Sequence, residues 1–169
     1  NLLMRMNKEG SLGFVALLMD DEGNNKNIER VNFTKGINEV NLNANGGNDT
    51  ITIDGTAETT NVDAGAGNDT IRVGQLYNAD MRDANTETKV QNDDLFNTIA
   101  VNTNHGVKYL SDGVSAGSTL NIEGAAGDDT FALLHNAGEE LKVSGGNGND
   151  GFSMYAFSNE DETGAIENG

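Results

Sequence analysis

The sequence predicts an all-β protein built as a parallel β-solenoid. A glycine–aspartate motif recurs four times, and alternating apolar and polar residues follow the copies. The aspartates of the first two copies are 20 residues apart, and those of the last two are 21 apart, which leaves room for two short strands and two turns in each coil. Each coil would then place its motif aspartate at the same edge of the stack. Apolar residues make up 36% of the chain, which is little for a wide globular core but adequate for a narrow stack.

The motif is complete at residues 145–153, which read G-G-x-G-x-D-x-U-x with U a large apolar residue. Residues 44–52, 64–72 and 124–132 keep a glycine, then Asn or Asp, then the aspartate, but have lost one or two glycines. Glycine permits positive φ and leaves backbone carbonyl oxygens uncovered, and the aspartate adds a carboxylate. Ca²⁺ prefers this set of oxygen ligands. An alternative is a calcium-free turn in which Asn and Asp side chains bond to the backbone.

These motifs resemble the hemolysin-type, or repeats-in-toxin (RTX), calcium-binding repeats, whose nonapeptides build a parallel β-roll. The resemblance implies that the first six residues of each repeat bind Ca²⁺ between stacked turns. It implies the following ligand residues: Gly47, Asn48, Asp49, Gly65, Gly67, Asn68, Asp69, Gly124, Gly127, Asp128, Asp129, Gly145, Gly146, Gly148, Asn149 and Asp150. It also implies a segment of a very large secreted or surface-displayed bacterial protein, located outside the cell, whose export signal is not in this segment.

The charge balance favours cations as partners. The chain carries 10 Lys and Arg against 27 Asp and Glu, a net charge of −17, which argues against nucleic acid and anionic membranes. No apolar run is long enough to span a bilayer, so membrane insertion is not expected. Cysteine is absent, which excludes a disulfide framework. The first residue is Asn rather than Met, which indicates a segment of a longer chain or a processed product.

Residues 1–37 are expected to form an N-terminal β cap over the first coil, because a solenoid end needs its apolar face covered. Two strands, at 2–6 and 12–19, are expected to flank a hairpin turn at 7–10, and a short strand should follow at 31–33. Residues 20–31 have some acidic spacing of an EF-hand loop, but Val31 stands where that loop needs Glu.

Residues 38–74 and 117–157 are each expected to form two coils with calcium turns. The residues predicted to point inward are Ile51, Ile53, Ile71, Val73, Phe131, Leu133, Phe152 and Met154. Because stacked coils lie about 4.8 Å apart, Asp49 should share ions with Asp69, and Asp129 with Asp150. Each pair would then control its own half of the chain.

Residues 75–116 interrupt the pattern as an irregular, loop-bearing linker, and 158–169 form an acidic tail expected to be frayed. Asp69 and Asp129 are 60 residues apart, three coil lengths, so the linker holds two irregular coils or the multiple is chance. Strands are expected at 96–101 and 107–110 around a turn at 104–106. Residues 83–94 partly match an EF-hand loop, but a solvated loop is the favoured interpretation because Gly is missing at its sixth place.

The sequence favours a non-enzymatic structural or adhesive module that calcium rigidifies, acting as a spacer, a scaffold or a filament-forming unit. Its expected partners are calcium ions, and copies of itself or neighbouring repeats. One alternative is a repeat module attached to a polysaccharide-acting enzyme. Another is an ice-binding calcium solenoid, because Thr50, Thr70 and Thr130 recur. His105 and His135 stand alone in turn-like settings, and no catalytic role is expected for them.

Overall fold

The described part of the chain consists of strands and turns, with no helix. The computed structural model describes residues 1–18, 28–34, 36–80, 96–155, 158–160 and 166–167. Its strands form sheets of seven, four and five strands. The two partial EF-hand loops, at 20–31 and 83–94, lie wholly or largely outside the described residues.

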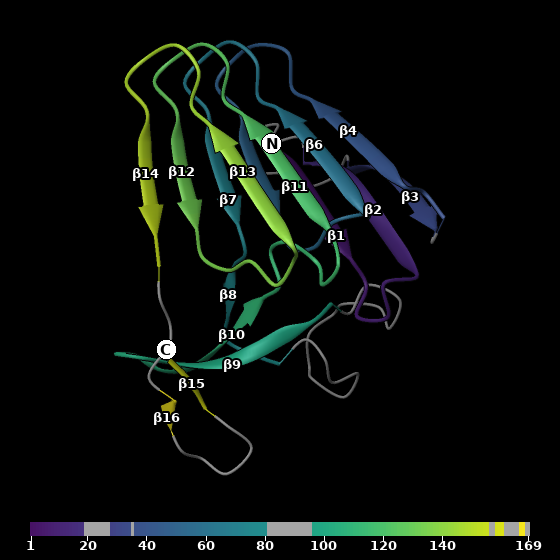
Figure 1. The fold of residues 1–169 in the computed structure, drawn as a ribbon, viewed down its shortest axis with the longest axis vertical. Coiled ribbons are helices and arrows are strands. Elements are labelled where there is room, and N and C mark those ends of the chain that lie inside the picture. The colour runs from purple at the N-terminus through teal and green to yellow at the C-terminus, as the bar shows by residue number, and fades with distance from the viewer. Residues whose placement is uncertain (19–27, 35, 81–95, 156–157, 161–165, 168–169) are drawn as a thin grey trace.

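Four two-strand units form the main body. In each unit a strand of the four-stranded sheet leads through a turn to a strand of the seven-stranded sheet (Figure 1). The units are unit 1, β4 (Glu39–Asn43) and β5 (Thr50–Ile53); unit 2, β6 (Thr59–Asp63) and β7 (Thr70–Val73); unit 3, β11 (Thr119–Glu123) and β12 (Thr130–Leu133); and unit 4, β13 (Glu140–Ser144) and β14 (Gly151–Met154). The coarse prediction of an all-β chain with short parallel strands is confirmed.

The units stack in order, with equivalent residues paired in register. Ile51 pairs with Ile71, Ile71 with Phe131, and Phe131 with Phe152, all between parallel strands. The four-stranded sheet repeats this alignment through β4, β6, β11 and β13. Unit 3 therefore lies directly on unit 2. The alternative that residues 75–116 hold two further coils is wrong, because no strand stands between β7 and β12.

The N-terminal hairpin extends the seven-stranded sheet beyond unit 1. Strands β1 (Leu2–Met6) and β2 (Leu12–Leu18) are antiparallel, as predicted, and β3 (Ile28–Thr34) pairs with β2. Strand β1 runs parallel to β5, with Leu2 beside Ile51 and Met4 beside Ile53. The alternating apolar residues of β1 thus continue the inward-facing rows of the units, and Met4 is fully buried.

Residues after unit 2 leave the stack and form most of the five-stranded sheet, which lies below it in Figure 1. Strand β9 (Thr98–Thr103) and β10 (Gly106–Ser111) form the predicted hairpin, and β8 (Leu76–Tyr77) pairs with β10. Part of the tail is also paired, through β15 (Ser158–Glu160) against β9 and β16 (Ile166–Glu167) against β15. The expectation of a frayed tail is wrong for these described segments, because β15 pairs with an edge of β9.

The core lies between the seven-stranded and four-stranded sheets. Ile51, Ile53, Ile71, Val73 and Phe131 are fully buried, as predicted, and residues of the facing sheet such as Leu120 and Val62 complete the cluster. Leu133 is only partly buried. The prediction fails for Phe152 and Met154, which are 51% and 83% exposed. Both lie on β14, the last strand of its sheet, so no further unit covers them.

Candidate functional site

The four glycine–aspartate turns lie at one end of the strands and stack along one edge of the molecule (Figure 1). Parallel bridges join Gly46 to Ala66, Ala66 to Ala126, and Ala126 to Asn147. The second and fourth motif positions have positive φ in every copy. At the second position φ is 69° to 96°, and Asn45 and Ala125 stand there besides two glycines. The local conformation of the turn is therefore the same in complete and degraded copies.

Glycine is required at the fourth motif position for two reasons. Its φ lies between 112° and 142°, a region that side chains rarely adopt. A Cβ at Gly67, Gly127 or Gly148 would also collide with a carbonyl oxygen of the preceding unit. The backbones of adjacent turns thus approach closely. This explains why all four copies keep this glycine while losing others.

The four motif aspartates form one continuous ladder of hydrogen bonds. The backbone N–H of Asp49 donates to Oδ1 of Asp69 at 2.7 Å, and that of Asp69 donates to Oδ1 of Asp129 at 2.8 Å. The N–H of Asp129 donates to Oδ1 of Asp150 at 3.0 Å. The predicted neighbours, Asp49 with Asp69 and Asp129 with Asp150, are adjacent in this ladder. Their separation into two independent halves is wrong, because unit 3 stacks on unit 2 and joins Asp69 to Asp129.

The residues before the aspartates form a second ladder in the opposite direction. The N–H of Asn68 donates to Oδ1 of Asn48 at 2.9 Å, and the N–H of Asp128 donates to Oδ1 of Asn68 at 3.0 Å. The N–H of Asn149 then donates to Oδ1 of Asp128 at 2.9 Å. Side chains of the motif thus bond to the turn backbone, as the calcium-free alternative requires.

The hydrogen bonds leave two buried carboxylate oxygens without a partner. Asp69 and Asp129 are each 1% exposed, and Oδ2 of both has no hydrogen-bond partner. Burial raises the pKa of Asp69 above its ordinary value of 3.8, the hydrogen bond from Asp49 opposes the shift, and the carboxylates of Asp129 and Asp49 add to it. Unsatisfied buried carboxylate oxygens are costly unless a proton or a cation is bound.

In units 3 and 4, the residue at the first motif position lies beside the Oδ2 atom of the motif aspartate. A Cβ on Gly124 would collide with Oδ2 of Asp129, and one on Gly145 with Oδ2 of Asp150. The two glycines therefore leave space beside these oxygens in units 3 and 4. Units 1 and 2 carry Ala44 and Ala64 at this position. All sixteen residues implied as ligands lie in the four stacked turns.

The described residues contain no group of three or more His, Cys, Asp or Glu side chains that could hold a metal ion together. The stacking explains this result, because each unit contributes one motif aspartate at the sixth position and successive units are displaced along the stack. Any cation bound here would need backbone carbonyl oxygens in addition to carboxylates, which Ca²⁺ accepts.

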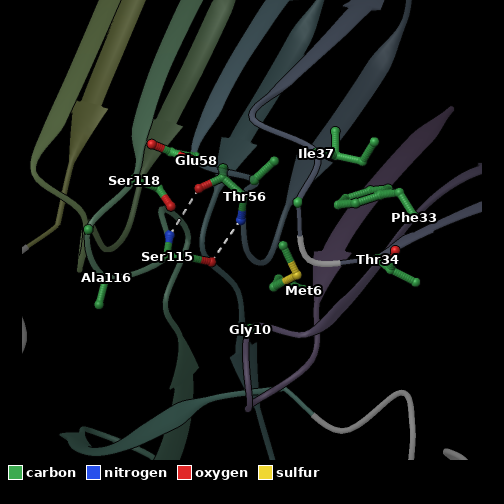
Figure 2. A pocket seen from close by; sticks show the side chains of 13 residues that line it. Met6, Gly10, Phe33, Thr34, Ile37, Thr56, Glu58, Ser115, Ala116 and Ser118 are labelled. Carbon is green, nitrogen blue, oxygen red and sulfur yellow. Dashed lines mark hydrogen bonds between the residues drawn. The ribbon is translucent and has the colours of Figure 1, made fainter.

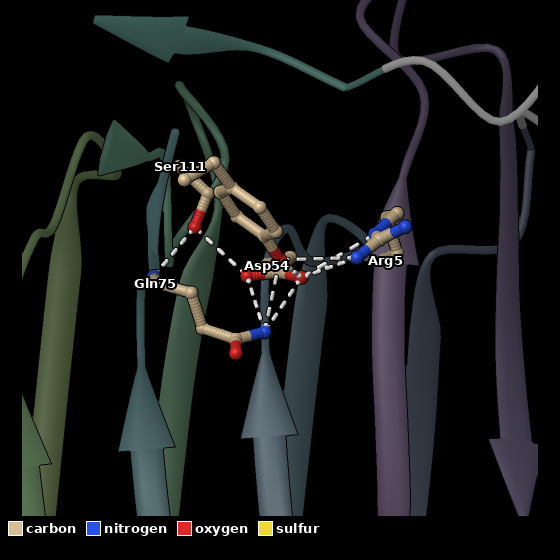
Figure 3. Close-up of polar contacts among 5 residues, drawn as sticks. Arg5, Asp54, Gln75 and Ser111 are labelled. Carbon is tan, nitrogen blue, oxygen red and sulfur yellow. Dashed lines mark hydrogen bonds and ion pairs between the residues drawn. The ribbon is translucent and has the colours of Figure 1, made fainter. Parts of the chain in front are cut away.

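A second polar cluster, centred on Asp54, was not predicted. Asp54 follows β5 at the opposite end from the turns and is 1% exposed. Arg5 Nη2 lies 2.8 Å from its Oδ2, and the Tyr77 hydroxyl donates to the same oxygen at 2.7 Å (Figure 3). The Ser111 hydroxyl donates to Oδ1 at 2.8 Å, and Gln75 Nε2 donates to both carboxylate oxygens.

The cluster joins three parts of the fold. Arg5 comes from β1 and Asp54 from the end of unit 1. Tyr77 and Ser111 come from the five-stranded sheet, and Gln75 from the segment that leads into it. The Arg5 guanidinium also lies 3.9 Å from the ring centroid of the buried Phe96. Burial, followed by the Asp54 carboxylate, raises the pKa of Tyr77 far above 10.0, so the hydroxyl remains a donor. Every carboxylate lone pair that faces the cluster is occupied, which is typical of a structural network rather than a reactive site.

A cavity of about 220 Å³ lies between the N-terminal hairpin and the turns that precede units 2 and 3 (Figure 2). Met6 and Phe33 line one side of it. On the other side Thr56 and Ser115 exchange two bonds, from Thr56 N to Ser115 Oγ at 2.9 Å and from Ser115 N to Thr56 Oγ1 at 3.1 Å. Among the described residues of the lining, Glu58 is the one titratable side chain. The described lining residues therefore offer one carboxylate beside hydroxyls that already bond to the backbone, and no acid–base pair among themselves.

The two histidines lie apart. His105 is exposed in the turn between β9 and β10, and His135 Nδ1 lies 3.1 Å from the Ser111 carbonyl oxygen.

Comparison of the chain with family models, with curated proteins and with solved structures finds no match. The described residues include no helical stretch with the length and apolar character needed to span a bilayer. The function proposed below therefore rests on the residues of the turn edge and on their geometry.

Proposed function

We propose that this chain is a calcium-binding β-solenoid module whose role is structural or adhesive. In this proposal the four units are the coils, and Ca²⁺ binds along the turn edge between them. The observation that carries it is the pair of unpartnered Oδ2 atoms on Asp69 and Asp129, both buried in the middle of the stack. A divalent cation would neutralise these carboxylates without disturbing the bonds made by Oδ1.

The residues of the turn edge fit Ca²⁺ in their chemistry. Carboxylate oxygens of the motif aspartates and carbonyl oxygens of the glycine turns are hard ligands, and the edge offers no thiolate or imidazole. The net charge of −17 further favours a cation on the folded chain. The chemistry supplied by the ion is charge neutralisation and cross-linking of adjacent turns.

The resemblance of the turns to RTX repeats supports a location outside the cell, in a secreted or surface-displayed bacterial protein. Calcium is abundant there, and weak sites suffice: extracellular calcium modules bind at about 10⁻⁴ to 10⁻³ M. A rigid rod of this kind would act as a spacer, a scaffold or a filament-forming unit, with copies of itself or neighbouring repeats as partners. The proposed role requires no catalysis.

The alternatives have less support. A module attached to a polysaccharide-acting enzyme needs that enzyme elsewhere in a longer chain, and the turn edge contributes nothing to such a reaction. Ice binding requires a flat threonine array. The row formed by Thr50, Thr70 and Thr130 ends at Gly151, and the next outward row contains Arg72 and Ala132.

Calcium titration of the wild type and of an Asp69→Asn variant tests the proposal. Asparagine can still accept the N–H of Asp49, but it removes the buried charge. With chelator present, we expect Asp69→Asn to be at least as stable as the wild type. In calcium at about 100 times Kd, the wild type should gain roughly 2.7 kcal/mol for each occupied site, and the variant should gain less. Thermal unfolding and calorimetric titration measure both quantities.

The matched control is Asp63→Asn, which removes the same charge from an exposed position outside the turn. It should bind calcium with the stoichiometry of the wild type. Asp129→Asn should behave like Asp69→Asn, whereas Asp150→Asn should have a smaller effect, because Asp150 lies in the last unit. If chelator changes neither the melting temperature nor the β-sheet circular dichroism of the wild type, the turns are held by hydrogen bonds alone and the proposal is wrong.

The raised pKa of Asp69 predicts a pH dependence of stability in the absence of calcium. A carboxyl whose pKa is higher in the folded than in the unfolded state binds protons preferentially when folded. Its contribution is therefore present below about pH 3.8 and is lost as the pH rises through the folded-state pKa. In chelator, the free energy of unfolding of the wild type should fall relative to Asp69→Asn across this interval. Urea titrations between about pH 3.5 and about pH 7 would measure the difference. Saturating calcium should reverse the difference near neutral pH.

A further inference from the structure

Strands β13 and β14 are the last strands of their two sheets at one end of the stack (Figure 1). Among the described residues, no further strand covers the apolar side chains between them. Phe152 is 51% exposed and Met154 is 83% exposed, while Leu141 and Val143 of the facing strand are half-buried. These side chains line a groove of about 520 Å³ between the two sheets. At the other end of the stack of units, β1 covers the equivalent edge of β5. The two ends of the stack are therefore different.

The exposed edge of unit 4 presents the same groups that unit 3 uses to bind unit 4. On β14 the N–H groups of Gly151 and Tyr155 donate to carbonyl oxygens of Asp129 and Leu133. The alternation of a parallel strand then directs the N–H groups of Phe152 and Met154 away from the stack. Unpaired edges of this kind bind further strands.

The turn of unit 4 also continues the two ladders. In units 1 to 3 the N–H of the motif aspartate donates to the aspartate of the following unit, and the residue before it accepts an N–H from that unit. The next donor in the series is the N–H of Asp150, and the next acceptor is Oδ1 of Asn149. A further unit with an Asp at its sixth motif position would match both.

A short chain connection is not needed to form this interface. Unit 3 packs on unit 2 in full register, although strands β8, β9 and β10, which lie between them in the sequence, belong to another sheet. The interface is therefore specified by the pairing of strands, apolar rows and ladders. A unit supplied by a separate polypeptide meets the same requirements.

A second copy of this chain does not meet them. The unit 1 face that would contact unit 4 is already occupied at β5 by β1. Contact between two open ends would oppose the strand directions, and contact of β14 with β3, the other edge of the seven-stranded sheet, would bring no glycine–aspartate turn. The donors and acceptors of the turns would remain unmatched in both arrangements. Each copy also carries a net charge of −17.

We infer that the end of the stack formed by β13 and β14 is a docking surface for a two-strand unit of the same type. This unit is carried by another polypeptide. Its face toward β13 and β14 must be uncovered before it binds. The unit consists of a five-residue strand, a glycine–aspartate turn and a four-residue strand, as in units 1 to 4. The inference deepens the proposed scaffold role by naming its contact surface, and it does not depend on calcium.

The test uses a fluorescent synthetic peptide of residues 118–134, which contains unit 3 and both of its faces. We expect saturable binding to the full chain, detected by fluorescence anisotropy. Hydrogen exchange at the amides of Phe152 and Met154 should slow at least tenfold when the peptide is saturating, because both N–H groups become paired. A peptide with Phe131→Asp should bind at least tenfold more weakly, because it places a carboxylate in the apolar groove.

The protein variant Met154→Pro removes one outward N–H and leaves the inward bonds of β14 in place. It should bind the wild-type peptide at least tenfold more weakly, while Met154→Val, the matched control, should bind normally. Circular dichroism with and without calcium checks that the variants fold and that the result is separate from the calcium proposal.

Three results would overturn the inference. One is the absence of peptide binding and of amide protection at millimolar peptide, which would make the face an inert end of the stack. Another is equal peptide binding by Met154→Pro and the wild type. The third is a dimer of the chain that Met154→Pro abolishes, which would assign the face to contact between copies.

Discussion

Replacing Ile71 with Asp should unfold the two-sheet stack. Ile71 is fully buried on β7, where it pairs with Ile51 on one side and Phe131 on the other. A carboxyl in this apolar core either stays ionised without a partner or takes up a proton at neutral pH, and both cost several kcal/mol in addition to the lost packing of Ile71. The total is comparable to the roughly 5–15 kcal/mol by which typical domains are stable. Far-ultraviolet circular dichroism of Ile71→Asp should therefore show the loss of the β-sheet signal at neutral pH, in calcium and in chelator.

Thr52→Asp is the matched control, because it adds the same charge to the neighbouring strand on the face that points away from the core. Thr52 pairs with Arg72, whose guanidinium is exposed beside it. This variant should keep the wild-type spectrum and change the free energy of unfolding by less than about 1 kcal/mol. A native-like spectrum for Ile71→Asp would contradict the inward register of β7.

The sequence was informative wherever the physical cause was local. Positive φ at the fourth motif position admits only glycine in practice, so Gly47, Gly67, Gly127 and Gly148 mark the turns even in degraded copies. Alternating apolar residues after each turn identified Ile51, Ile71 and the other inward positions. A turn residue and a period-two pattern both act within a few residues, and single-sequence analysis can detect them.

The failures concern which units lie beside one another. The spacing of 60 residues between Asp69 and Asp129 suggested intervening coils, but the chain leaves the stack and returns to the same edge. No local signal distinguishes an excursion from two irregular coils. The exposure of Phe152 and Met154 has the same origin, because their pattern is that of inward residues and only the missing neighbour leaves them uncovered.

The sequence placed the implied ligand residues in repeated turns but did not show how the turns are connected, and calcium binding itself stays a prediction. All the implied ligands lie in the stacked turns, and the ladder joins all four aspartates rather than two pairs. The Asp54 cluster could not be found in the sequence at all. Its members lie at positions 5, 54, 75, 77 and 111, and Asp54 is followed by Gly55 and Thr56, which reads as an ordinary turn.

Removing the Asp54 side chain should therefore be among the most damaging changes outside the apolar core. In Asp54→Ala, Arg5 loses its carboxylate partner, and Tyr77, Gln75 and Ser111 lose the acceptor that they share. Removing one partner of a buried ion pair costs about 3–5 kcal/mol, because the remaining charge is left without compensation. We expect a loss of this size in urea unfolding. The control Asp63→Ala, which removes an exposed carboxylate, should change stability by less than about 0.5 kcal/mol.

The effect of calcium on the stability of the variants should distinguish the Asp54 cluster from the turn edge. Asp54 lies at the opposite end of its strand from the turns, and its two oxygens are already bonded to protein donors. Asp54→Ala should therefore lose the same free energy in calcium and in chelator, and the calcium stoichiometry should match that of the wild type. Asp69→Asn should show the opposite behaviour, with an effect on stability that changes sign between the two conditions. If Asp54→Ala instead released bound calcium, the network around Asp54 would belong to the ion site, and its assignment as a purely structural junction between β1, unit 1 and the five-stranded sheet would be wrong.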